Sequence, residues 1–170
     1  MIRARFVAGD VALGETFNTV RVNLIARECD PGELLQDVCC MRQRMRDHLV
    51  TPPAPGQPED GSGILGKFEL KHDTGAIVDI EFMVQYVVLA GASRHGGLVR
   101  WTDVMRLLDE LESAGLIPEP EVVALQRAYL AFRGAVHHGW LGPDTDFEHL
   151  QRYRQEVHSI WLARMEAGDY

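Results

Sequence analysis

Apolar residues recur every three or four positions along most of this chain, which is the spacing of helices that bury one face. The pattern predicts six helices and almost no strand. These helices cover about residues 10–27, 31–48, 76–92, 102–115, 118–137 and 145–165. An all-α bundle of about five to six helices is the architecture that such a pattern favours.

Residues that cap helices support four of the predicted starts. The expected N-cap residues are Asp10, Asp30, Thr102 and Thr145. Asp30 is the clearest, because Pro31 suits the first helical position and Glu33 stands three residues after the cap. In the helix that follows, the face opposite the apolar positions is expected to be solvated. That face consists of Arg42, Arg44, Arg46 and Asp47.

One stretch departs from the helical pattern. Residues 51–63 contain four of the eight prolines, three glycines and no large apolar residue. Such a segment cannot bury enough surface to offset the entropy of ordering it. We therefore predict one helical domain over 1–170, with N-terminal helices at 1–48, a flexible loop at 49–66 and a C-terminal helical bundle at 67–170.

Composition narrows the class of protein. An apolar fraction of 46% and a charged fraction of 25% are ordinary for a globular domain. No apolar run approaches the roughly 20 residues that span a bilayer. The net charge of −8 disfavours non-specific binding to nucleic acid or anionic lipid. The three cysteines, Cys29, Cys39 and Cys40, form neither a disulfide framework nor a Cys-x-x-Cys metal motif, which indicates a cytoplasmic protein.

Two carboxylates, Asp79 and Glu81, interrupt the most apolar segment of the chain, residues 76–90. Charged groups in a core segment are costly unless they are paired. A strand would place both on one face, where they could hold Mg²⁺ for phosphoryl transfer. A helix would place them about 200° apart, nearly opposite. We favour the helix, because the segment is longer than a typical strand and contains no turn signal.

Each carboxylate also has a structural interpretation. Asp79 would fall in the first turn of a helix that starts near Gly75, where the helix dipole favours an acid. Glu81 lies deeper and would need an ion pair with a cation from another segment. The candidate cations are Lys71, Arg100, Arg3 and Arg5. No Gly-rich phosphate loop and no Gly-x-Ser-x-Gly nucleophile motif occurs in the sequence.

The residues from Lys71 to Tyr86 form a longer motif. Lys71-His-Asp-Thr-Gly-Ala-Ile-Val-Asp-Ile-Glu-Phe-Met-Val-Gln-Tyr86 resembles the Lys…Gly-Gly-Ile-x-Asp-Ile-Glu-Phe-x-x-Gln-Tyr signature of bacterial bifunctional glutamine synthetase adenylyltransferase/adenylyl-removing enzymes. Shorter matches in the same order are Arg3-Ala-Arg5, Val99-Arg-Trp-Thr-Asp103 and His137-His138. Ala76 replaces the second glycine of the signature, and Val104 stands where the family usually has asparagine.

The resemblance implies a place in a large enzyme. Members of that family have two halves, one that attaches AMP to a tyrosine of glutamine synthetase and one that removes it. Each half pairs a nucleotidyltransferase head with a helical domain. This chain resembles the helical domain that closes the AMP-attaching half, and it lacks the head. The resemblance therefore implies ATP and Mg²⁺ as cofactors of the full-length enzyme, none bound to this chain alone, and no activity for the isolated chain.

Roles for individual residues follow from the same resemblance. Lys71, Asp79, Glu81, Arg3 and Arg5 are expected to line or brace one wall of the active-site cleft, with no catalytic residue and no metal ligand in this chain. The expected partners are glutamine synthetase, the PII signal protein and the N-terminal portions of the same polypeptide. Arg100 and Trp101 are candidates for partner contact or for anchoring the core.

Three alternatives remain open at this point. The chain could be a docking module for glutamine synthetase or PII, or the equivalent domain of a deadenylylating or PII-uridylylating relative. It could be a scaffold in which Glu81 only bridges to an arginine. Outside the family, it could be a small metal-dependent phosphotransferase that uses Asp79 and Glu81 on a strand.

Overall fold

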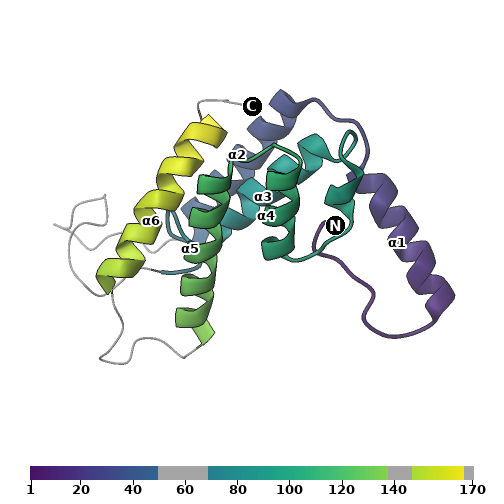
Figure 1. The fold of residues 1–170 in the computed structure, drawn as a ribbon, viewed down its shortest axis with the longest axis horizontal. Coiled ribbons are helices and arrows are strands. Elements are labelled where there is room, and N and C mark those ends of the chain that lie inside the picture. The colour runs from purple at the N-terminus through teal and green to yellow at the C-terminus, as the bar shows by residue number, and fades with distance from the viewer. Residues whose placement is uncertain (50–68, 138–146, 167–170) are drawn as a thin grey trace.

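The computed structural model describes residues 1–49, 69–137 and 147–166, and every regular element in them is helical. The elements in chain order are α1 (Val11–Ile25), α2 (Pro31–Leu49), α3 (Ile77–Gly91), a 3₁₀ turn (Gly96–Val99), α4 (Val104–Ser113), α5 (Glu119–His137), α6 (Phe147–Trp161) and a π-helical turn (Leu162–Glu166). The predicted all-α bundle is confirmed (Figure 1). The proline-rich segment 51–63 lies outside the described residues.

The bundle is built around α3, which packs against α2, α4, α5 and α6. A helix that is apolar on all sides has to be enclosed on all sides. Ten of the fifteen residues of α3 are buried, so the other helices gather around it. A phosphotransferase that pairs Asp79 with Glu81 would need this segment to be a strand. The segment is a helix, so that alternative is wrong.

Side-chain caps fix where the helices begin. The Asp10 carboxylate accepts from the Leu13 N–H at 3.1 Å, and the Asp30 carboxylate accepts from the Glu33 N–H at 2.9 Å, so both predicted caps are confirmed. At α4 the cap is Asp103 rather than Thr102, because the Asp103 carboxylate is the group that reaches the Arg106 N–H, at 3.1 Å. The cap expected at Thr145 lies outside the described residues.

Helix α1 stands apart from the bundle (Figure 1). The helical pattern of its apolar residues does not produce a buried face, because only Gly14, Arg21 and Ile25 of this helix are buried. Arg21 holds the C-terminal end of α1 to the body. Its guanidinium donates to the carbonyl oxygens of Val99 and Trp101 at 2.8 and 3.1 Å. Burial lowers the pKa of Arg21.

Within the described ranges, no helix is long and apolar enough to cross a membrane.

Candidate functional site

Asp79 lies in the first turn of α3 and is completely buried. Its Oδ2 accepts a hydrogen bond from the Gly75 backbone N–H at 2.6 Å. The same carboxylate pairs with two guanidinium groups of α2, with Arg42 Nε 2.5 Å from Oδ1 and Arg46 Nη2 3.0 Å from Oδ2. We call these four residues the Asp79 node. The node fastens α2 to the start of α3.

The two arginines of the node correct the prediction of a solvated face on the second helix. Arg42 is fully buried, and the Arg46 side chain is only 18% exposed, while Arg44 and Asp47 are exposed. Burial lowers the pKa of Arg42, and the neighbouring Asp79 carboxylate opposes that change. The prediction failed because a buried carboxylate on another helix compensates the cost of burying a guanidinium.

The register of α2 contains the signal that was missed. Leu35, Val38 and Cys39 pack against the core, and Arg42 follows them at helical spacing on the same stripe. A cation in an apolar stripe needs a buried acid opposite it. Asp79, in the most apolar segment of the chain, is that acid.

The turn before α3 is pressed against α6. Gly75 has a φ of +77°, and a Cβ atom there would lie 2.3 Å from the backbone oxygen of Arg154. Arg154 Nε donates to the Thr74 carbonyl oxygen at 2.7 Å. The Arg46 guanidinium lies over the Trp161 ring, 5.3 Å from its centroid. The Asp79 node therefore joins α2, α3 and α6, and its enclosure favours the structural interpretation of Asp79.

Glu81 lies on a different side of α3 and reaches the surface. Its Oε1 is 2.5 Å from Arg3 Nη1, so Arg3 is the partner among the four candidate cations. The Tyr129 hydroxyl from α5 donates to the same oxygen at 3.3 Å. The side chains of Arg3 and Glu81 are 45% and 17% exposed. We call Arg3, Glu81 and Tyr129 the Glu81 cluster.

Electrostatics separate the cluster from the Asp79 node. Burial raises the pKa of Tyr129, and the Glu81 charge adds to that shift, so its hydroxyl stays protonated and donates to Glu81 at neutral pH. The Arg3–Glu81 ion pair is partly exposed on the Arg3 side, and solvent screening weakens such a pair. A fully enclosed pair such as Arg42–Asp79 is far more costly to break. A contribution to stability therefore explains the contacts of Asp79 better than it explains those of Glu81.

The other predicted wall residues lie in two further places. Lys71 is exposed beside the start of α3, where its carbonyl oxygen accepts from the Val78 N–H at 3.1 Å. Arg5 and Arg100 both line one surface hollow between α1 and the body. The structure therefore brings together Arg3 with Glu81, and Arg5 with Arg100, but encloses Asp79 away from both pairs.

Trp101 makes one hydrogen bond and lies against two guanidinium groups. Its Nε1 donates to Glu110 at 3.0 Å. The guanidinium groups of Arg100 and Arg106 lie over its ring, 5.4 and 4.4 Å from the centroid. The indole is half-buried and packs against the core, so anchoring is the role that its contacts favour over clamping a partner.

The described residues offer no metal centre, because no three of their His, Cys, Asp or Glu side chains are grouped so that they could hold an ion. Residues 43–141, more than half of the 170-residue chain, match the family model described as GlnD PII-uridylyltransferase. The chain belongs to this family. The Glu81 cluster and the Asp79 node both draw residues from the matched range.

Curated relatives are bifunctional glutamine synthetase adenylyltransferase/adenylyl-removing enzymes. The chain is 43% identical to the one from Pseudomonas aeruginosa over 165 residues, which is 95% of this chain and 17% of that protein. It is 37% identical to the one from Methylococcus capsulatus over 98% of this chain and 17% of that protein. It is 33% identical to the one from Pasteurella multocida over 99% of this chain and 16% of that protein. The chain spans about one sixth of the length of these relatives.

Proposed function

We propose that this chain is the helical part of a longer glutamine synthetase adenylyltransferase that transfers AMP from ATP to a tyrosine of glutamine synthetase. The observation that carries the proposal is the match to enzymes of that name over 95% or more of this chain. The resemblance of residues 71–86 to the adenylyltransferase signature adds to it, and this segment includes the first ten residues of α3.

Within that enzyme, the Glu81 cluster forms part of one wall of the active-site cleft. Arg3, Glu81 and Tyr129 come from three separate segments, and Arg3 carries the cluster to the surface. Lys71, exposed just before the start of α3 and apart from the cluster, is proposed to line the same wall. The Arg3 cation and the Glu81 acid, held together, suit the orientation of a charged substrate or of a residue in a facing domain.

The longer polypeptide supplies the chemistry that this chain does not. In-line AMP transfer needs a metal to bind the triphosphate and an oriented nucleophile. We expect the metal-binding residues to belong to the rest of that polypeptide. We accordingly expect ATP and Mg²⁺ to bind the longer enzyme in the cytoplasm and the isolated 170-residue chain to be inactive.

A second candidate is uridylyl transfer to the PII protein, which the name of the matching family favours. That match covers residues 43–141, whereas the adenylyltransferase relatives align over nearly the whole chain. The fuller alignment makes AMP transfer the first candidate.

The two candidates differ in the nucleotide and in the target. We expect the longer polypeptide to label glutamine synthetase with AMP from radioactive ATP, and to leave PII unlabelled when UTP is supplied. The 170-residue chain, assayed in parallel, should label neither protein. Labelling of PII by UTP, with none of glutamine synthetase by ATP, would replace the first candidate with the second.

A further inference from the structure

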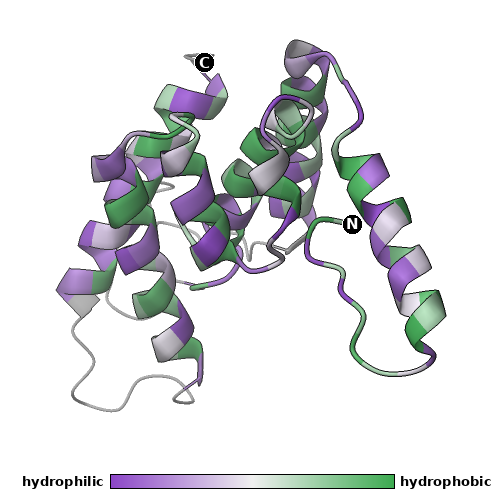
Figure 2. Cartoon of the chain, turned by 45° about the vertical axis from the view of Figure 1, so that its right-hand side comes forward, coloured by the Kyte–Doolittle hydropathy of each residue, from purple (hydrophilic) through white to green (hydrophobic). Residues whose placement is uncertain are grey.

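Three arginines line the surface hollow between α1 and the body. Its volume is about 440 Å³, and its wall includes Arg5, Arg21 and Arg100. Pockets that bind small ligands have volumes of about 300–1,000 Å³. The segment that carries Arg5 passes from the body to the start of α1 (Figure 2), so the three cations come from three separate parts of the chain. We call this feature the arginine hollow.

Arg21 is a buried cation that its surroundings leave uncompensated. It is 3% exposed, and the acceptors that the structure gives its guanidinium are backbone carbonyl oxygens, which carry no formal charge. No acidic side chain among residues 1–49, 69–137 and 147–166 forms an ion pair with it, and its Nε–H has no hydrogen-bond partner there. A buried charge without a counter-charge is costly, so an anion beside Arg21 would be stabilising.

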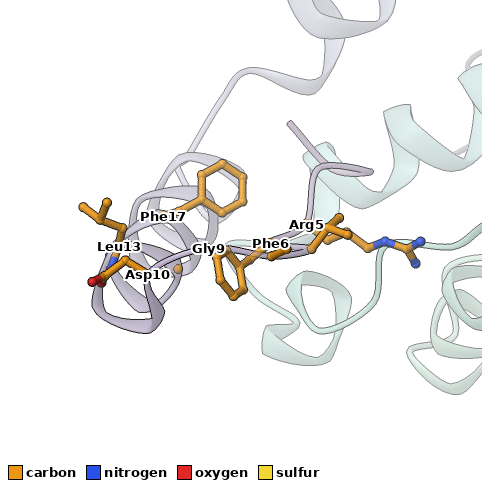
Figure 3. A pocket seen from close by; sticks show the side chains of 9 residues that line it. Arg5, Phe6, Gly9, Asp10, Leu13 and Phe17 are labelled. Carbon is orange, nitrogen blue, oxygen red and sulfur yellow. The ribbon is translucent and has the colours of Figure 1, made fainter.

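The other two arginines add charge to the same hollow. Arg5 and Arg100 are exposed, and neither forms an ion pair within the described ranges. Figure 3 shows the Arg5 side chain extended, with its guanidinium on the side away from Leu13 of α1. The Arg100 guanidinium lies over the Trp101 ring, a contact that orients it without neutralising it. Among the described residues that line the hollow, Glu15 is the one acid, so the wall carries a formal charge of +2 in a chain that carries −8.

The rest of the lining is part polar and part apolar. Asn18 and Thr102 contribute polar side chains, and Phe6 and Val11 contribute apolar ones. The Phe6 ring is seated against Gly14, where a Cβ atom would lie 2.8 Å from it. Guanidinium groups bind phosphate through paired N–H donors, and amide and hydroxyl groups can donate to further oxygens. Apolar side chains beside them would contact a carbon skeleton.

We propose that the arginine hollow binds a small organic phosphate, with the phosphate group at Arg5, Arg21 and Arg100 and the apolar part against the apolar lining. A phosphate dianion would offset the formal charge of +2 and place a counter-charge beside the buried Arg21. Neither Glu81 nor Arg3 lines this hollow, so the inference goes beyond the proposed function and does not rest on it.

Calorimetric titration of the purified 170-residue chain tests the proposal with three probes. Phenyl phosphate, which joins a phosphate group to an aromatic ring, should bind with one molecule per chain. Inorganic phosphate should bind about tenfold more weakly, because it lacks the apolar part. Phenol, which lacks the phosphate group, should not bind detectably.

Single substitutions locate the site. Arg5→Gln and Arg100→Gln should each weaken phenyl phosphate binding about tenfold. Glu15→Gln removes the acid of the hollow and should strengthen binding about threefold. Arg44→Gln, at an exposed arginine of α2 outside the hollow, makes the same change in net charge as the two arginine variants and should leave binding unchanged. All four residues are exposed, so the variants are expected to fold, which circular dichroism checks.

Four results would overturn the proposal. The absence of saturable binding of phenyl phosphate up to about 10 mM would show that the hollow holds no phosphate. Equal affinity for phenol and phenyl phosphate would make it an apolar site. Equal affinity for inorganic and phenyl phosphate would assign it to free phosphate. Equal losses in Arg44→Gln and Arg5→Gln would reduce the effect to the net charge of the chain.

Discussion

Replacing Asp79 by alanine is expected to lower the free energy of unfolding by about 3–5 kcal/mol. The substitution leaves the guanidinium groups of Arg42 and Arg46 without the carboxylate that lies 2.5 and 3.0 Å from them. It also removes the acceptor of the Gly75 N–H. Urea denaturation of the purified chain, followed by circular dichroism, measures the change.

A matched control and a paired variant make this prediction specific. Asp37→Ala, at an exposed aspartate of α2, should change the free energy of unfolding by less than about 0.5 kcal/mol. Arg42→Met combined with Asp79→Leu should cost less than the sum of the two single changes, by about 2 kcal/mol, because the pair is removed together. A loss below about 1 kcal/mol for Asp79→Ala would refute the structural role of the node.

Gly75→Ala is expected to destabilise the bundle by about 3 kcal/mol, the second large effect. Two costs combine there. The φ of +77° is unfavourable for alanine, and the new Cβ would lie 2.3 Å from the Arg154 backbone oxygen, which belongs to α6 and cannot rotate away. The turn before α3 would have to separate from α6. Thermal unfolding of the purified chain provides the measurement.

Gly115 is the control for this substitution. Its φ is +71°, close to that of Gly75, but a Cβ atom there would meet nothing within 4 Å. Gly115→Ala should therefore cost only the backbone term, about 1 kcal/mol. If the two alanine variants were equally stable, the close approach of α6 to Gly75 would contribute nothing.

Helix periodicity and capping residues predicted most of the fold. The spacing of apolar residues predicts where α2 to α6 lie, because in these helices burial of one face decides the structure. The same spacing also predicts α1, but Val11, Leu13, Val20 and Leu24 of that helix are exposed in this chain. Periodicity reports that a helix has an apolar face, and it does not report which surface covers that face.

The candidate site was predictable only in part. Asp79 and Glu81 are conspicuous as acids in an apolar segment, and Arg3 was among the cations expected to pair with Glu81. Arg42 and Arg46 were assigned to solvent because charged side chains are mostly exposed. Their partner is more than 30 residues away in sequence, and contacts at that separation depend on how α2 and α3 pack.

We propose that the buried Asp79 node holds the fold while the Glu81 cluster serves AMP transfer in the longer polypeptide. Glu81→Gln in the longer polypeptide tests it most directly, because glutamine keeps the acceptor for Tyr129 and removes the charge opposite Arg3. AMP incorporation into glutamine synthetase should fall about tenfold. The melting temperature should change by less than about 2 °C. Glu112→Gln, at an exposed glutamate of α4, should leave both unchanged. Incorporation by Glu81→Gln equal to that of Glu112→Gln would contradict the account.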